Sequence, residues 1–247
     1  MRVAILGPLE LRDEHGVPLL VSGLKRRALL ATLVLRAGRT MSADRLIEEL
    51  WGEHPPANAA NALQAHVRRL RTMLSSVAGG PDRLTTRPPG YVLHLRPGET
   101  DVEDFVAGVS AARLARPAEA ITLLRDALAI WRGPALAGSV SGDLCAAEAG
   151  MLEELRLTTL ETLFDLSLRT ARHAEVIGEL ERTTAANPLR ERFYDQLMAA
   201  LHRSSRSADA MDVYMLARQR LRTELGVEPG PALRARASQV TDQGLRS

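Results

Sequence analysis

The stretch ANAANALQAHVRRLRTMLSS, residues 57–76, decides the fold predicted for the first part of the chain. At the 3.6-residue period of an α-helix, one face of this stretch is apolar and carries Leu63, Val67, Leu70 and Leu74. The opposite face carries amide and guanidinium groups, from Asn61, Gln64, Arg68 and Arg71, with Arg69 on its flank. These two side-chain types pair best with purine edges in the major groove. The pattern therefore predicts a helix with one core face and one face suited to DNA.

The segments on either side of this helix predict a small α+β domain. Residues 2–21 hold three short β-type runs separated by turns, and predict an antiparallel meander. Two helices follow, at 24–36 with Ser22 as the N-cap and at 43–51 with Ser42 as the N-cap. After the 57–76 helix, LTTR and YVLHL flank Pro88-Pro89-Gly90 and predict a hairpin with Arg87 at its tip. Strands, three helices and a hairpin in this order predict a winged helix-turn-helix domain.

From Asp101 onward the patterns are helical only. We predict helices at 102–115, 118–132, 144–171, 173–186, 189–203, 207–225 and 231–242, with one long loop at 133–143. Large and small apolar residues recur at the 34-residue spacing of tetratricopeptide repeats, first at Leu160, Leu163, Val176 and Leu180 and again at Tyr194, Leu197, Ala210 and Tyr214. The fold class expected is therefore mainly α, with a winged domain at 1–98 and an all-α, tetratricopeptide-like domain at 99–247. An ordinary helical bundle is the alternative for the second domain.

Charge is divided unequally between these two parts. Residues 1–98 carry 14 Lys and Arg against 8 Asp and Glu, whereas residues 99–247 carry 18 against 22. A basic amino-terminal part and a mildly acidic remainder favour nucleic acid as the partner of the first domain. No apolar run reaches membrane-spanning length, so no membrane partner is expected. The single Cys145 excludes an internal disulfide framework and favours a reducing cytoplasm.

Patterns typical of catalysis or cofactor binding are not found in the sequence. The six histidines lack paired ligand spacing, so no metal site is predicted. No histidine is placed by motif beside Cys145, so a catalytic thiol is not expected. The only lysine, Lys25, lies in SGLKRR and excludes a glycine-rich phosphate loop with its lysine. We therefore predict no enzyme activity and no cofactor.

Longer motifs resemble a known family. LIEELWG (46–52), AHVRRLR (65–71) and PGYVL (89–93) resemble the winged-helix effector domain of bacterial response regulators. The remainder resembles the bacterial transcriptional activator domain, through ALAIWRGPAL (127–136), LEELRL (152–157), NPLRERFYDQLMAAL (187–201), DVYMLARQRLRTELGVEP (212–229) and PALR (231–234). In this order the two are similar to a short Streptomyces antibiotic regulatory protein. The sequence departs from the family at Thr170-Ala171 and Ser204-Ser205, where a glycine usually stands between helices.

The resemblance implies a transcription activator of antibiotic biosynthesis genes. Such a protein binds direct repeats in double-stranded promoter DNA as a homodimer and recruits RNA polymerase holoenzyme through its sigma and alpha subunits. The loop between the second and third helices meets the polymerase in related activators, which makes Glu53, His54, Pro55 and Pro56 the candidate contacts.

The third helix and the hairpin supply the candidate DNA contacts. Base contacts are expected from Asn61, Gln64 and one or two of Arg68, Arg69 and Arg71, with phosphates held by the others. Arg87 is expected at the minor groove, which attracts arginine where it is narrow. Lys25, Arg26 and Arg27 begin a helix and are candidates for gripping a phosphate. For all these charges the alternative is an ordinary solvated surface.

A second function class fits part of the pattern. Helical repeats also serve as peptide-binding adaptors, in which case the winged domain would be a scaffold without specific DNA binding. The basic amino-terminal part and the arginine row argue against this alternative.

Overall fold

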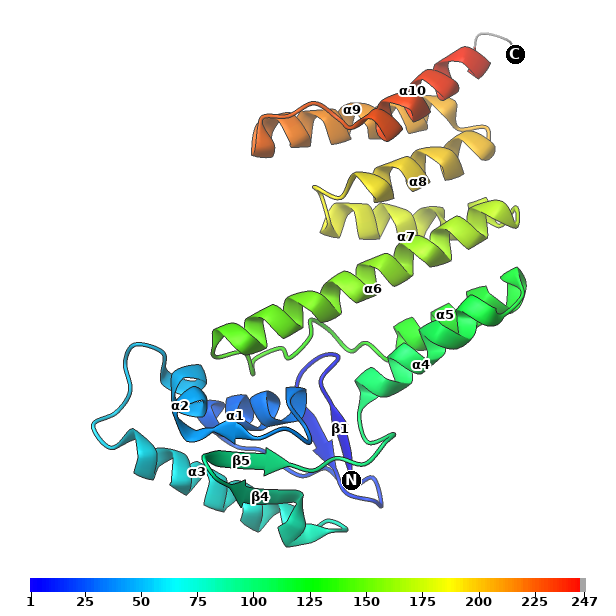
Figure 1. Ribbon diagram of the computed structural model, residues 1–247. Coiled ribbons are helices and arrows are strands. Elements are labelled where there is room, and N and C mark those ends of the chain that lie inside the picture. Colours follow the sequence, from blue (N-terminus) through cyan, green and yellow to red (C-terminus); the bar gives the residue numbers. More distant parts are fainter. Residues whose placement is uncertain (245–247) are drawn as a thin grey trace. The chain divides into compact units, whose positions relative to one another are not determined.

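The computed structural model describes residues 1–244, which form two compact units (Figure 1). The first unit contains residues 1–111 and 126–157, and the second contains 112–125 and the described residues from 158 onward. Helices α4 (Asp101–Leu114), α5 (Pro117–Ala129) and α6 (Asp143–Arg169) each contribute residues to both units. The predicted domain boundary between residues 98 and 99 stays a prediction. Residues 245–247, at the end of the second predicted domain, lie outside the described residues.

The first unit contains the predicted winged helix-turn-helix (Figure 1). Strands β1 (Arg2–Ala4) and β2 (Glu10–Arg12) form an antiparallel pair. Helices α1 (Leu24–Leu35), α2 (Ala43–Trp51) and α3 (Ala59–Leu74) follow, with the two-residue strand β3 (Met41–Ser42) before α2. Strands β4 (Leu84–Arg87) and β5 (Gly90–Leu93) form the expected hairpin, and the sheet order is β3-β5-β4. A short 3₁₀ helix, Gly80–Arg83, leads into β4.

Two local predictions for this unit were wrong, and one short strand was missed. The third amino-terminal run is not a strand and makes only one bridge, from Arg12 to Pro18. Strand β3 was not expected, because two residues give no periodic signal. Ser22 is not the N-cap of α1: the cap residue is Gly23, and the Ser22 hydroxyl instead accepts a hydrogen bond from Arg26 Nη2 at 3.1 Å. Ser42 does cap α2, with its hydroxyl accepting from the N–H of Arg45 at 3.2 Å.

Helix α3 has the predicted core face but is shorter than predicted at both ends. Its N-cap is Asn58, whose side chain accepts from the N–H of Asn61 at 3.3 Å. The four predicted core residues are at most 2% exposed and pack in a common core with residues of α1 and α2: Leu63, Val67, Leu70 and Leu74. Their burial fixes which face of α3 is turned to solvent.

The core of the first unit also draws on residues well beyond the winged domain. Leu136 and Cys145 belong to the same buried cluster as α1, α2 and α3. The backbone N–H of Leu136 donates to Ile5 O at 2.9 Å, and that of Arg132 donates to Leu6 O at 2.8 Å. The long loop between α5 and α6 is therefore held against the amino-terminal segment. In the part of the chain that the structure describes, no helix is both long enough and apolar enough to cross a membrane.

The second unit consists of helices, as predicted. It includes α7 (His173–Ala186), α8 (Glu191–Arg203), α9 (Ser207–Leu225) and α10 (Pro231–Gly244), together with the second half of α6. Consecutive helices form hairpins, with α8 packed against both α7 and α9 (Figure 1). Six of the eight residues that carry the repeat spacing are buried, namely Leu163, Val176, Leu180, Tyr194, Leu197 and Ala210, whereas Leu160 and Tyr214 are half-buried.

The two turns that depart from the family pattern share one backbone conformation. Ala171 has φ 57° and Ser205 has φ 60°, in the left-handed region that glycine adopts most easily. The two positions are 34 residues apart, so the same turn recurs at the period seen in the sequence. This recurrence supports stacked helix hairpins, while the likeness to tetratricopeptide repeats stays a prediction.

Candidate nucleic-acid interface

The solvent-facing side of α3 presents a row of polar side chains. Asn61, Gln64 and Arg68 are all exposed, since the buried residues of α3 occupy the opposite face. Asn61 and Gln64 carry both a donor and an acceptor, and Arg68 carries a fork of donors. This row has the chemistry needed to recognise base edges, because it combines amides with a guanidinium on one exposed helix face.

Arg71 extends this row but is engaged with the hairpin. Its Nε donates to Leu84 O at 2.8 Å, and its Nη2 donates to Thr86 Oγ1 at 2.8 Å. The guanidinium also lies over the ring of Tyr91, 5.8 Å from the ring centre. Arg71 is half-buried and joins α3 to both strands of the hairpin. Its sequence-predicted role as a DNA contact stays a prediction, but its geometry gives it a positioning role.

Arg87 lies at the end of β4, opposite Gly90 of β5, and is exposed. Gly90 is needed there because a Cβ at this position would lie 1.8 Å from the carbonyl oxygen of Met41. Only glycine lets β3 run this close to β5. The hairpin that carries Arg87 is thus anchored on one side by β3 and on the other by Arg71.

Arg69 is exposed on the other flank of α3. The pKa of the neighbouring His66 is lowered, first by burial and then by the positive charges of Arg26, Arg69 and Lys25. His66 is therefore neutral at pH 7, and the three cations form a second basic group beside it. The predicted DNA contacts on α3 divide into two sets, one on each flank of the helix.

The basic run at the start of α1 is partly used within the fold. The Lys25 ammonium donates to Leu50 O, at the end of α2, and Arg26 donates to Ser22. Arg27 is half-buried. Arg26 is partly exposed and, like Arg69, contributes positive charge at His66. Phosphate binding by these residues stays a prediction.

The loop after α2 is exposed over Glu53, His54, Pro55 and Pro56. Gly52 has φ 55°, which ends α2, and the N–H of His54 donates to Trp51 O at 3.1 Å. The loop is thus held at its start and free to meet a partner at its tip. Its contact with polymerase stays a prediction.

Sequence reasoning missed a buried ion pair behind the hairpin. The guanidinium of Arg83 donates to both carboxylate oxygens of Glu99, at 2.6 and 2.7 Å, and also to Ala78 O and His94 O. Burial raises the pKa of Glu99. Hydrogen bonds from Arg83 and from the Arg96 N–H lower the pKa by more than burial raises it, so the net shift is downward. The pair ties the end of the 3₁₀ helix to the segment after β5. No sequence signal identifies it, since the partners are 16 residues apart in irregular segments.

A second buried carboxylate, Glu49 of α2, was also missed. It is 2% exposed, lies 2.9 Å from Arg45 Nη2, and accepts from the N–H of Leu144, in the first turn of α6, at 3.1 Å. The Glu49 carboxylate lies at the amino-terminal end of α6, where the helix dipole favours a negative charge. Gly142 leaves room for it, because a Cβ there would lie 2.3 Å from Glu49 Oε2. Helix α2, which precedes the exposed loop of Glu53 to Pro56, is therefore joined to the start of α6.

The described residues hold no cluster of His, Cys, Asp and Glu suited to a metal ion. Cys145 is fully buried beside Thr32 Oγ1 at 3.3 Å, and burial raises the pKa of its thiol, so it is protonated at neutral pH.

Comparison with known proteins shows the family to which the chain belongs. Residues 100–241 match the bacterial transcriptional activator domain, and residues 22–93 match the domain described as transcriptional regulatory protein, C terminal. The chain belongs to the Streptomyces antibiotic regulatory protein family. Members of this family are transcriptional regulators rather than enzymes.

Several members of the Streptomyces antibiotic regulatory protein family and its relatives align along nearly the whole chain. The transcriptional regulator RedD of Streptomyces coelicolor is 42% identical over 98% of this chain and 71% of its own length. The regulatory protein AfsR of Streptomyces griseus is 42% identical over 94% of this chain, which spans only 24% of AfsR. The solved structure of Mycobacterium tuberculosis EmbR in complex with a low affinity phosphopeptide has a TM-score of 0.89 at 34% identity, and covers 98% of this chain and 65% of EmbR.

Proposed function

We propose that this protein is a sequence-specific DNA-binding activator of antibiotic biosynthesis genes. It binds direct repeats near the promoter as a homodimer and recruits RNA polymerase holoenzyme, in the cytoplasm. The observation that carries the proposal is the exposed row of Asn61, Gln64 and Arg68 on α3, set beside a hairpin anchored by Arg71.

Physical chemistry supports base contacts by one flank of α3 and phosphate contacts by the other. The row stands on a helix whose other face is locked in the core, so the polar groups are held rigidly rather than on a mobile loop. A bidentate pair between an arginine and guanine, or an amide and adenine, contributes about 1–3 kcal/mol of discrimination between bases. Arg69 and Arg26 on the other flank are suited to phosphates, which position the protein without selecting sequence.

Footprinting on promoters of the neighbouring gene cluster tests the proposal. Wild-type protein is expected to protect direct repeats, and Arg68→Ala is expected to lose about 5- to 160-fold in affinity for them, the equivalent of about 1–3 kcal/mol. Arg182→Ala is the matched control, since Arg182 is an exposed arginine on α7 in the second unit. Absence of specific protection by the wild type, or equal binding by Arg68→Ala, would support the adaptor alternative instead.

Salt dependence separates base contacts from phosphate contacts. Removing a phosphate contact lowers the slope of log affinity against log salt by about one and weakens binding to all sequences alike. We expect this behaviour for Arg69→Ala. For Asn61→Ala we expect an unchanged slope and a loss confined to the specific repeats. If the two variants behave alike, the assignment of the flanks is wrong.

The polymerase contact is tested by transcription in vitro. Replacing Pro55 and Pro56 with alanine is expected to reduce activated transcription while promoter affinity stays at the wild-type level. The loop lies outside the hydrogen bonds that hold α3 and the hairpin, so binding has no structural reason to fall. Loss of DNA binding in this variant contradicts the assignment.

A further inference from the structure

The carboxy-terminal end of α2 carries a carbonyl group that the helix leaves without a donor. Leu50 is the penultimate residue of α2, and the last four carbonyls of a helix have no N–H partner within it. The next N–H groups are used elsewhere. That of Gly52 donates to Glu48 O, and that of His54 donates to Trp51 O. Leu50 is 1% exposed, so its carbonyl needs a donor from another segment of the chain.

Two side chains from distant segments supply this donor. The Lys25 ammonium, in the first turn of α1, donates to Leu50 O, and the Ser141 hydroxyl donates to the same oxygen at 3.2 Å. Lys25 lies within the residues that match the regulatory domain, 22–93, and Ser141 within those that match the activator domain, 100–241. The two sequence modules therefore meet at one carbonyl, inside the first unit.

The chemistry of this end of α2 favours both contacts. The carboxy-terminal end of a helix carries partial negative charge, so a lysine ammonium is stabilised there. The preceding residue is held from the same side as Ser141, because the Glu49 carboxylate accepts from the N–H of Leu144 at 3.1 Å. Two successive residues of α2 are thus bound by the segment that begins α6.

The candidate polymerase loop, Glu53 to Pro56, starts three residues after this carbonyl. The loop is exposed, and the backbone at Gly52, with φ 55°, turns the chain out of α2. Proline fixes φ near −65° and also restricts the residue before it, so Pro55 and Pro56 make the loop stiff. A stiff loop carries any change of direction at its base through to its tip. The orientation of the end of α2 therefore decides where the loop points.

We propose that Lys25 and Ser141 are positioning residues for this loop and act together through the Leu50 carbonyl. The proposal rests on the polymerase contact of the proposed function and deepens it, because it gives the activator domain a part in placing the loop. Lys25 then serves the loop instead of a DNA phosphate, and phosphate contacts are left to Arg26 and Arg69.

Amide hydrogen exchange at Gly52 and His54 in the full chain tests the proposal. Two donors share one acceptor, so either can hold the end of α2 alone, and Lys25→Met or Ser141→Ala is expected to speed exchange less than about threefold. The double variant leaves a buried carbonyl without a donor and is expected to speed exchange at least about tenfold. Lys25→Arg, combined with Ser141→Ala, keeps a cationic donor and is expected to restore slow exchange. Circular dichroism controls for folding of each variant.

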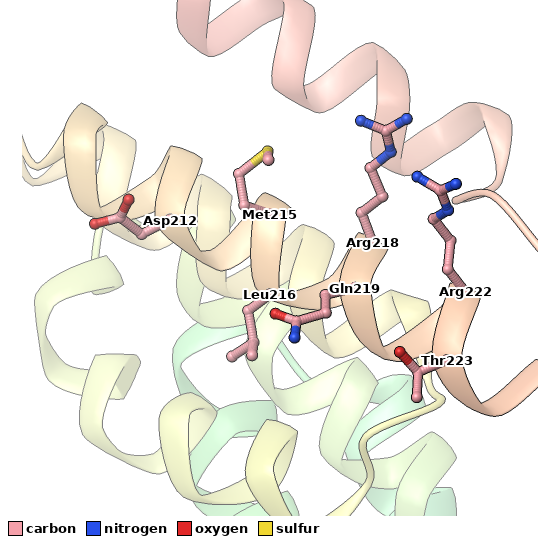
Figure 2. Close-up of a pocket in the computed structure, with 7 residues that line it drawn as sticks. All are labelled: Asp212, Met215, Leu216, Arg218, Gln219, Arg222 and Thr223. Atoms are coloured by element: carbon pink, nitrogen blue, oxygen red, sulfur yellow. The ribbon is translucent and has the colours of Figure 1, made fainter.

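Two controls match the charge that Lys25→Met removes. Figure 2 shows Arg222 on α9 of the second unit, in an open hollow of about 550 Å³, and its side chain is 61% exposed. Arg222→Met is expected to leave exchange at Gly52 and His54 unchanged. Arg26 donates to Ser22 and not to α2. Arg26→Met is therefore expected to lower the slope of log promoter affinity against log salt by about one, whereas Lys25→Met leaves the slope unchanged.

Transcription in vitro shows whether the held end of α2 matters to the polymerase. The double variant Lys25→Met/Ser141→Ala is expected to lose at least about threefold in activated transcription while promoter affinity stays at the wild-type level. Three results overturn the proposal. They are unchanged exchange in the double variant, a salt slope lowered by about one in Lys25→Met, or faster exchange with full transcription activity.

The exchange measurement needs neither promoter nor polymerase, so the two proposals can fail separately. If the wild type binds no promoter, the proposed function fails, while faster exchange in the double variant still shows that Lys25 and Ser141 hold the base of the loop. If promoter binding and activation follow the proposed function but the double variant exchanges like the wild type, the proposed function stands and the positioning role fails.

Discussion

Replacement of Arg83 by methionine probes the buried ion pair behind the hairpin. Methionine keeps an unbranched apolar stem but removes the charge and all five donors of the guanidinium. The Arg83 and Glu99 side chains are only 4% and 11% exposed, so the variant leaves a carboxylate in a nearly dry site.

The expected cost follows from what remains around Glu99. Its partners would be the Arg96 N–H at 2.8 Å and the amino terminus at 3.5 Å, while Ala78 O and His94 O lose a donor. Removing one member of a buried, hydrogen-bonded pair costs about 3–5 kcal/mol of unfolding free energy. For a chain of this size, 3 kcal/mol corresponds to a fall of about 6–12 °C in Tm.

Tryptophan fluorescence during urea unfolding is the appropriate measurement. Both tryptophans, Trp51 and Trp131, belong to the first unit, so the signal follows the unit that contains the pair. Arg12→Met is the matched control, since Arg12 and Glu10 are an exposed pair of the same unit at 3.3 Å. Its expected cost is below about 1 kcal/mol.

A double-mutant cycle refutes or supports the reasoning. Arg83→Met/Glu99→Gln is expected to be less destabilised than the sum of the single variants by about 1–3 kcal/mol, because no unpaired charge remains. If the single effects add to within about 0.5 kcal/mol, the two side chains are not coupled and the argument is wrong.

The pKa of Glu99 gives the pair a pH dependence. A carboxyl whose pKa is lower in the folded state than in the unfolded state stabilises the fold above its ordinary value of about 4.3. That stabilisation is lost as pH falls through the lower, folded-state pKa. Wild type is therefore expected to lose stability more steeply than Glu99→Gln below about pH 4.3, and parallel curves contradict this.

Three further predictions test the hairpin anchor, the start of α6 and the helical turns. Arg71→Ala is expected to reduce promoter affinity and to speed hydrogen exchange over 84–93, whereas Arg68→Ala reduces affinity with exchange unchanged. Gly142→Ala is expected to destabilise the first unit by about 1–3 kcal/mol in urea, because its Cβ overlaps Glu49, while Gly150→Ala, with open space around it, stabilises slightly. Ser205→Gly is expected to raise the Tm of the second unit, measured by circular dichroism, because a φ of 60° strains serine by about 1 kcal/mol. The control Ser204→Gly, at a φ of −93°, is expected to lower the Tm, because glycine gains flexibility in the unfolded chain without relieving strain.

The sequence alone determined the elements that depend on local periodicity. The core face of α3, the Ser42 cap and the hairpin around Pro88-Pro89-Gly90 each follow from residues within one turn or strand pair. The helices of the second unit followed in the same way, to within a few residues. Helical spacing and turn chemistry act between near neighbours, so the printed sequence already contains them.

Only the tertiary structure decided which polar side chains of α3 stay exposed and which hold the fold. In the sequence, Arg68 and Arg71 are equivalent members of one row, three residues apart. In the structure, Arg68 is exposed, whereas Arg71 donates to Leu84 and Thr86 of the hairpin. The pairs Arg83–Glu99 and Glu49–Leu144 were likewise invisible, because contacts between distant segments leave no period in a single sequence. Packing, which brings such segments together, assigns each charge its role.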